Sequence, residues 1–185
     1  RHPMLPIPMM AGLSYFIKST NWNYASAPEP YLDNRRIAWP RGKVLGGTSS
    51  INGMMYIRGH RRDYDGWAES GLDGWSYDEV LPYFKRAEGN RDRHDEFHGN
   101  DGPYITGRAK SDNPLYPVFL EACRQAGHPA TDDFNGAEQE GVGRQDYNID
   151  KGRRVCSATA YLAPVRSRPN LHTVTRAHAT KLLFE

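Results

Sequence analysis

A glycine-rich segment near position 46 constrains this chain more than any other feature of its sequence. Gly46 and Gly47 precede three small hydroxyl residues at 48–50. Paired glycines let a backbone approach a flat or anionic ligand closely, and the hydroxyl residues leave N–H groups that can point at oxygen acceptors. The segment can therefore cradle a cofactor. It matches neither the Walker A pattern nor G-x-G-x-x-G, so an ordinary glycine-rich turn remains an open alternative.

The chain has few residues with which to build a core of its own. Leu, Ile, Val and Phe make up 32 of the 185 residues, which is low for a self-contained globular domain. A disordered chain would carry more net charge than +2 and far fewer aromatic residues than the 11 Tyr, 6 Phe and 4 Trp found here. We therefore expect an ordered, loop-rich piece of a larger protein, and the apolar ending at 182–184 supports that expectation.

Composition and patterning argue against several classes of protein. The most apolar stretch, Met4–Leu13, is short and is interrupted by Pro6 and Pro8, so no membrane span is expected. Cys123 and Cys156 have no C-x-x-C partner, which argues against a disulfide framework or a zinc knuckle. No secretory signal is visible, and a cytoplasmic location is expected. Carboxylates are interspersed among the basic residues, so no nucleic-acid partner is expected.

Hydrophobic spacing predicts helices in the middle of the chain. Arg61–Ser70 has its aromatic residues at helical spacing. Ser76 and Glu79 form a capping box for a helix that runs to about Glu88, with a kink expected at Pro82. Further helices are expected after an N-cap pair at 113–114, over Ser157–Val165, and, as a short piece, over Leu13–Ile17.

The remaining segments are expected to be strands or loops. Val142–Ile149 and Leu171–Arg176 alternate as strands do, and Ala179–Phe184 is predicted to form a final strand. Residues 89–112 are polar and rich in glycine, and most of residues 1–40 are rich in Pro, Asn and Tyr, so both segments are predicted to be loops.

The segment Arg41–Tyr56 resembles the signature of the glucose-methanol-choline (GMC) family of flavoprotein oxidoreductases, and the resemblance continues through Arg58, Gly59 and Asp65. The similarity extends over nearly the whole chain, through short runs at 63–67, 74–77, 81–84, 97–103, 157, 160–162 and 168–171. The Asn-Gly-Met-Met-Tyr and Arg-Gly details are most similar to the choline-dehydrogenase-like bacterial branch.

This resemblance implies an α/β fold, namely a fragment of an FAD-binding Rossmann-like flavoprotein with part of the substrate or lid region. It implies a flavin-contact loop region at 1–60 and a helical lid region at 61–130. Residues 131–185 would enter the substrate domain and return to the FAD domain. The parent enzyme would oxidise a small-molecule alcohol by passing hydride to flavin N5. The family's catalytic His and its G-x-G-x-x-G turn would belong to the remainder of its own chain, so no catalytic residue is assigned here.

Two groups of residues would contact FAD according to the family pattern. Those that would line the side from the pyrophosphate to the flavin are Val44, Gly46, Gly47 and Thr48. Those that would follow the edge of the isoalloxazine ring are Asn52, Gly53, Met54 and Met55. Some relatives carry a His that bonds covalently to the flavin where this chain has Ile51, so non-covalent FAD is expected.

Other candidate residues have simpler interpretations. A metal site could use His94, His98, Asp95 and Glu96, but nearby glycines argue against the helix that it needs, so no metal is expected. Core packing rather than ligand stacking is expected for Trp67, Trp75, Tyr83 and Phe84. Solvated or ion-paired roles are expected for Arg58, Arg61 and Arg62, and a surface position for His172 and His178. A non-catalytic cofactor-contact or protein-interaction module is the alternative function.

Overall fold

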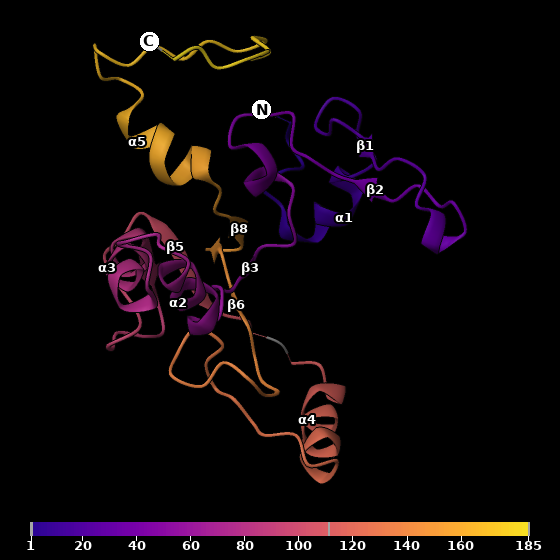
Figure 1. The fold of residues 1–185 in the computed structure, drawn as a ribbon, viewed down its shortest axis with the longest axis vertical. Coiled ribbons are helices and arrows are strands. Elements are labelled where there is room, and N and C mark those ends of the chain that lie inside the picture. The colour runs from indigo at the N-terminus through magenta and orange to yellow at the C-terminus, as the bar shows by residue number, and fades with distance from the viewer. Residues whose placement is uncertain (1, 111, 185) are drawn as a thin grey trace.

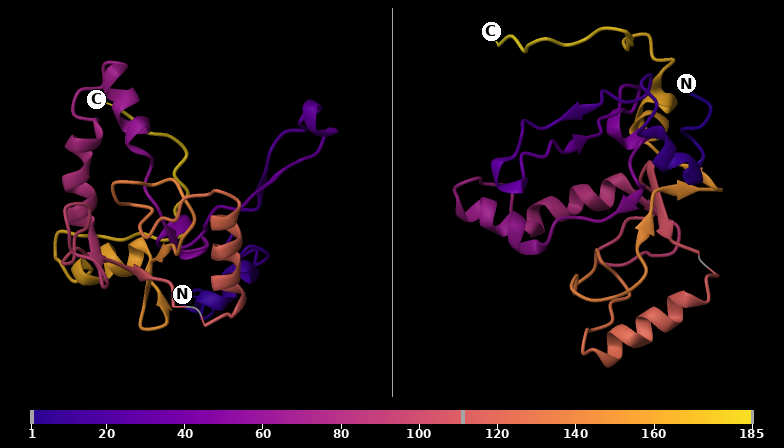
Figure 2. Two further views of the ribbon diagram at one scale, coloured as in Figure 1. Left: turned by 90° about the horizontal axis from the view of Figure 1, so that it is seen from below. Right: turned by 90° about the vertical axis from the view of Figure 1, so that its right-hand side faces the viewer.

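The computed structural model describes residues 2–110 and 112–184. Figure 1 shows a central body around β3, β5 and β6, from which the β1–β2 hairpin, the helix α4 and the C-terminal segment project. The right-hand view of Figure 2 places α4 and the C-terminal segment at opposite ends of the molecule. The helices and strands are α1 (Ala11–Ser14), β1 (Tyr24–Ala25), β2 (Ala38–Trp39), β3 (Met55–Tyr56), α2 (Arg61–Glu69), α3 (Tyr77–Ala87), β4 (Glu88–Asn90), β5 (Tyr104–Arg108), α4 (Leu115–Gln125), β6 (Asp146–Tyr147), β7 (Ile149–Asp150), β8 (Arg153–Arg154) and α5 (Ala163–Val165). Helical turns of other types are η1 (Pro8–Met10), η2 (Pro30–Leu32), η3 (Gly47–Ser50) and η4 (Ala158–Leu162).

The helices predicted in the middle of the chain are confirmed. α2 begins after a capping box made by His60 and Asp63, which the sequence analysis did not identify. α3 has the predicted capping box, and its helical turns continue without a break through Pro82. α4 begins two residues after Asn113, whose side-chain oxygen accepts a hydrogen bond from the backbone N–H of Leu115 at 3.0 Å. Local signals were sufficient here because capping is a contact between near neighbours in the sequence.

The capping box of α3 gives a simple test of this local stabilisation. The backbone N–H and the hydroxyl of Ser76 both donate to the Glu79 carboxylate, at 3.1 and 2.6 Å. Replacing Ser76 with Ala is expected to lower the free energy of unfolding by about 1 kcal/mol, which chemical denaturation can measure. Ser167→Ala, at an exposed position, is the matched control and is expected to change it by less than about 0.5 kcal/mol. Equal losses in the two variants would contradict a capping role for Ser76.

The central sheet brings together segments that are distant in the sequence. Its strand order is β3-β6-β5-β4. Tyr147 of β6 lies opposite both Met55 of β3 and Gly107 of β5, and both pairings are antiparallel. β4 and β5 are parallel although only a loop joins them. The sheet therefore fixes the end of the glycine-rich segment against the middle and later parts of the chain.

Several expectations for strands and loops are wrong. Residues 89–112 contain β5 and most of β4, whose buried Glu-Gly-Asn sequence has no apolar alternation to announce a strand. Leu171–Arg176 and Ala179–Phe184 form no strand, because no described segment pairs with them. The predicted strand Val142–Ile149 is partly confirmed by β6 and the start of β7, whereas β8 was missed. The short helix near the N-terminus is α1, which begins two residues earlier than predicted.

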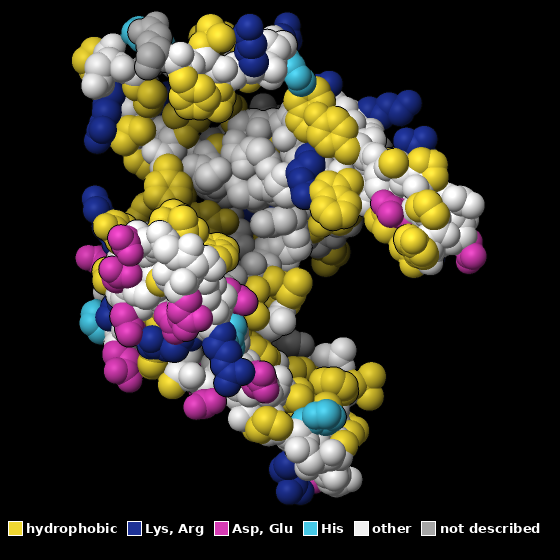
Figure 3. Space-filling model, viewed as in Figure 1, with side chains coloured by type: hydrophobic (Ala, Val, Ile, Leu, Met, Phe, Trp, Pro, Cys, Tyr) yellow, Lys and Arg dark blue, Asp and Glu magenta, His cyan; other side chains and the backbone are white. Residues whose placement is uncertain are grey.

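Few apolar side chains are buried in the described part of the chain. Seven hydrophobic residues are buried there, compared with thirteen polar or charged ones. Large apolar side chains remain exposed at Phe16, Phe119 and Phe184. Figure 3 shows hydrophobic side chains along the upper part of the molecule and on α4, and acidic ones gathered over the lobe of α2 and α3. The expected shortage of core residues is thus visible in the structure.

The aromatic residues of α2, α3 and the segment between them are more exposed to solvent than predicted. The rings of Trp67 and Trp75 meet edge to face at 5.7 Å, and Tyr64 contacts both Trp67 and Phe84. However, Trp67, Trp75 and Tyr83 remain 45%, 50% and 68% exposed. Helical spacing shows that residues share a face, but whether a second layer covers that face depends on the rest of the fold. None of the helices described is both long and apolar enough to cross a membrane.

Candidate functional site

The diglycine segment forms a tight turn that only glycine fits well. Gly46 and Gly47 have φ angles of 90° and 53°, a region that side chains disfavour. The N–H of Gly47 donates to the carbonyl of Val44 at 2.8 Å, and the 3₁₀ turn η3 follows directly. A Cβ on Gly42 would lie 2.1 Å from the carbonyl oxygen of Gly47. The two halves of the turn are therefore in direct backbone contact.

Residues from the far end of the chain hold this turn in place. The backbone N–H of Ser157 donates to the hydroxyl of Ser49 at 3.0 Å, and the Ser157 hydroxyl donates to the carbonyl of Gly46 at 3.2 Å. A Cβ on Gly46 would also lie 3.2 Å from the side chain of Ala158 in η4. The conformation of the glycine-rich segment thus depends on contacts across more than 100 positions of sequence.

A cavity of about 1160 Å³ opens beside the segment. Residues 42–45 and Ser50 form one part of its wall, and the segments around β8 and 174–178 form others. Trp22 also lines the cavity, with the Lys43 ammonium 4.6 Å from the centroid of its ring and the His178 ring 5.2 Å away. Parts of the chain from both ends therefore enclose one concave surface.

Among the residues that the structure describes, the wall of this cavity carries basic side chains and no acidic ones. Its ionisable basic residues are His2, Lys43, Arg153, Arg154, Arg176 and His178, and no Asp or Glu is among its lining residues. The sequence shows the reason: residues 151–184 contain no acidic residue, and residues 1–62 contain only Glu29 and Asp33. The expectation of interspersed carboxylates is wrong for these two segments, and counting charge segment by segment would have revealed it. Such a wall favours an anionic ligand.

The predicted cofactor-contact residues occupy different positions around this cavity. Of the eight predicted cofactor-contact residues, Val44 lines the cavity. Gly46, Gly47 and Thr48 belong to the turn beneath η4, and Asn52 turns its side-chain oxygen to the backbone N–H of Met54 at 3.1 Å. Gly53 follows Asn52 directly, Met54 is 5% exposed, and Met55 is 55% exposed in β3. Ile51, where some relatives carry a His, is completely buried.

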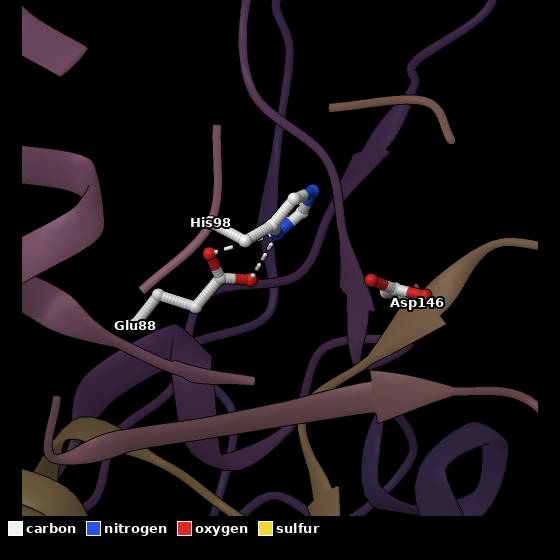
Figure 4. A group of neighbouring side chains, drawn as sticks. All are labelled: Glu88, His98 and Asp146. Atoms are coloured by element: carbon white, nitrogen blue, oxygen red, sulfur yellow. Dashed lines mark hydrogen bonds and ion pairs between the residues drawn. The ribbon is translucent and has the colours of Figure 1, made fainter. Parts of the chain in front are cut away.

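A second group of ionisable residues forms a buried network that includes side chains from the strands of the central sheet. Glu88 of β4 accepts hydrogen bonds from Arg58 at 2.7 Å and from Thr106 at 2.9 Å. His98 lies between two carboxylates, with Nδ1 3.0 Å from Glu88 and Nε2 2.9 Å from Asp133. Figure 4 shows the His98 ring facing Glu88 of β4, while Asp146 lies on β6, which β5 separates from β4 in the sheet. Glu88 is completely buried and His98 is 1% exposed, so the network replaces a hydrophobic core here.

The charges of this network are set by its hydrogen bonds. Burial alone would lower the pKa of His98, but bonds to Asp133 and Glu88 outweigh it and raise the pKa to about 9. Burial opposes ionisation of Glu88, yet His98 and Arg58 hold its pKa below the usual value. The pKa of Asp146 is raised by burial, although Asn90 donates to it at 3.1 Å. His98 is therefore an imidazolium shared by two carboxylates at neutral pH.

Several members of this network lie close together in space. Glu88, His98 and Asp146 lie close enough to share a metal ion, as do Asp95, His98 and Asp133. Both nitrogens of His98 already have carboxylate partners, so the geometry describes a hydrogen-bond network. His94, a candidate metal ligand from the sequence, belongs to neither of these two groups. The expected roles of the arginines are confirmed: Arg58 pairs with Glu88, Arg61 pairs with Asp78, and Arg62 is exposed. The expected surface positions of His172 and His178 are confirmed as well.

The comparison with protein families decides what kind of chain carries this site. Residues 11–185 match the family model described as GMC oxidoreductase. The chain belongs to the GMC oxidoreductase family. The resemblance carried by residues 41–65 is thereby confirmed.

Sequence relatives of this GMC chain are dehydrogenases of greater length. It is 46% identical over 183 residues to an oxygen-dependent choline dehydrogenase of Sinorhizobium fredii, and 45% identical over 183 residues to one of Brucella ovis. Each match covers 99% of this chain and 33% of the relative. The chain thus spans about a third of the length of these relatives.

Solved structures of related flavoenzymes have the same fold. Pyridoxine 4-oxidase from Mesorbium loti matches with a TM-score of 0.88 and 33% identity over 95% of this chain and 35% of that chain. An FAD-dependent oxidoreductase from Chaetomium thermophilum matches with a TM-score of 0.88 and 27% identity over 98% of this chain and 33% of that one. The expected α/β class, as part of a larger GMC flavoprotein fold, is therefore confirmed.

Proposed function

We propose that this chain is the cofactor-contacting part of an FAD-dependent oxidoreductase that oxidises an alcohol. The observation that carries the proposal is the acid-free, basic cavity beside the diglycine turn. FAD bears a pyrophosphate, and basic side chains with free backbone N–H groups are the usual means of binding such an anion. Family membership and the oxidoreductase names of the relatives support the same chemistry.

Each part of the cavity has a proposed role toward FAD. Lys43, Arg153 and Arg176 of its wall would attract the pyrophosphate. Val44 of the wall and the adjoining Gly46–Thr48 turn would lie along the cofactor toward its ring. Residues Asn52–Met55 would follow the edge of the ring. When bound, the flavin would accept hydride from the alcohol carbon while a base outside this chain takes the hydroxyl proton. The chain's own residues would bind and orient the cofactor.

We further propose that the rest of a longer polypeptide completes this unit. Residues 1–60 would supply the flavin-contact loop, 61–130 the helical lid region, and 131–185 the entry to the substrate domain and the return to the FAD domain. The central sheet takes strands from all three ranges, so they would fold together. The apolar face of α4, where Leu115, Val118 and Phe119 are exposed, would pack against the additional segments.

The proposed cofactor can be tested on the full-length protein that contains this chain. Purified protein is expected to show a flavin absorption spectrum that bleaches when an alcohol substrate is added without oxygen. After acid precipitation, the flavin is expected in the supernatant, because the buried aliphatic Ile51 offers no atom for a covalent bond. Flavin in the precipitate would contradict non-covalent binding. Protein that binds no flavin even when FAD is added would favour the alternative of a protein-interaction module.

A further inference from the structure

Arg154 is a buried cation on the wall of the cofactor cavity. It lies in β8 and is 5% exposed. Its backbone N–H donates to the carbonyl of Pro6 at 2.9 Å, and its Nε donates to the carbonyl of Leu5 at 3.1 Å. Among the residues that the structure describes, no carboxylate forms an ion pair with it. Burial accordingly lowers the pKa of its guanidinium. The hydrogen bonds of its side chain therefore all go to neutral oxygens.

The same guanidinium holds the segment that follows the diglycine turn. Its Nη1 donates to the side-chain oxygen of Asn52 at 2.7 Å and to the carbonyl of Ser49 at 3.3 Å. The same Asn52 oxygen also accepts from the backbone N–H of Met54, whose φ of 65° is unusual for a residue with a side chain. One cation thus supports a strained loop from inside the fold.

These contacts give Arg154 two effects on whatever occupies the cavity. Bonds to Ser49 and Asn52 limit the movement of the loop between them. The unpaired charge adds a positive potential to a cavity wall that contains no acid. In a poorly solvated site such a charge acts over several ångströms, because water does not screen it fully.

We propose that Arg154 is a positioning residue that fixes residues 49–54 and stabilises negative charge on a flavin ring bound in the cavity. This inference rests on the proposed function. It assigns to Arg154 control over how readily the bound flavin takes up negative charge, a role distinct from binding the pyrophosphate.

The charge effect can be measured with sulfite as the probe. The sulfur lone pair of sulfite forms a bond to the oxidised flavin ring, and the π electron pair that this bond displaces leaves a negative charge on the ring. The addition needs no other oxidant or reductant. In the full-length FAD-bound protein, Arg154→Gln is expected to raise the dissociation constant for sulfite about tenfold. Arg166→Gln, which removes the same charge from an exposed position, is the matched control and is expected to leave it unchanged. Equal sulfite affinities in Arg154→Gln and the wild type would overturn the proposed charge effect.

The positioning effect is tested with Arg154→Lys, which keeps the charge and is expected to fold. Lysine cannot reproduce the separate contacts of Nη1 and Nε, so we expect faster amide hydrogen exchange in a peptide covering residues 49–54 and sulfite affinity close to wild type. Unchanged exchange in that peptide would overturn the positioning role. If the wild-type protein binds no flavin, the proposed function fails first, which separates that result from a failure of this inference.

Discussion

Replacing Gly42 with Ala is expected to destabilise the protein by about 3 kcal/mol and to reduce FAD binding by tenfold or more. The added Cβ would lie 2.1 Å from the carbonyl oxygen of Gly47 and 2.7 Å from the backbone nitrogen of Thr48, on the opposite side of the turn. Backbone atoms cannot move aside as a flexible side chain does, so the turn itself must shift. Denaturation of the full-length protein and titration with FAD measure the two effects.

Gly12→Ala is the matched control for this prediction. An added Cβ at Gly12 would meet nothing within 4 Å, and the residue lies in the helix α1. Alanine is expected to leave FAD affinity unchanged and to affect stability by no more than about 1 kcal/mol, in the stabilising direction. If Gly42→Ala bound FAD as tightly as the control, the cofactor would not depend on the geometry of this turn.

Replacing His98 with Leu is expected to cost about 3–5 kcal/mol of the free energy of unfolding. The substitution removes the partner of both Glu88 and Asp133, and Glu88 is completely buried. A buried carboxylate that loses a cationic partner must remain poorly solvated or take up a proton. Denaturation at neutral pH measures the loss. His94→Leu, at an exposed position of the same loop, is the control and is expected to change stability by less than about 0.5 kcal/mol.

The same histidine predicts how stability depends on pH. Its pKa is raised from 6.5 to about 9 in the folded protein, because the bonds to Asp133 and Glu88 outweigh the effect of burial. The folded state therefore binds the proton more tightly than the unfolded state. The stabilisation is complete below pH 6.5 and is lost as the pH rises toward 9.

His98→Gln separates the charge from the hydrogen bonds. Glutamine can still bond to the neighbouring carboxylates but does not titrate, so its free energy of unfolding is expected to vary less than that of the wild type between pH 6.5 and 9. Identical pH profiles for the two proteins would show that His98 is neutral in the folded state, against the geometry described above. This variant also provides a test if His98→Leu fails to fold.

Local contacts explain which parts of the fold could be predicted. The helices α2, α3 and α4 follow from spacing and capping within a few residues, and the Ser76–Glu79 box is one such case. β4 could not be predicted in this way, because its side chains are buried by a polar network assembled from four distant segments. The C-terminal apolar run has strand-like composition, yet in the described structure it has no partner strand.

The candidate site also has features that the sequence could predict and features that only the tertiary structure determines. The sequence alone determined the diglycine turn, because glycine at positive φ is a requirement of single residues. The resemblance of residues 41–65 to the GMC family supplied the prediction of a flavin ligand. Only the tertiary structure decided that β8 and the segment 174–178 complete the cavity wall, that Arg154 supports the loop, and that His98 is shared by two carboxylates. Those features depend on contacts between residues up to about 150 positions apart, which no local pattern reports.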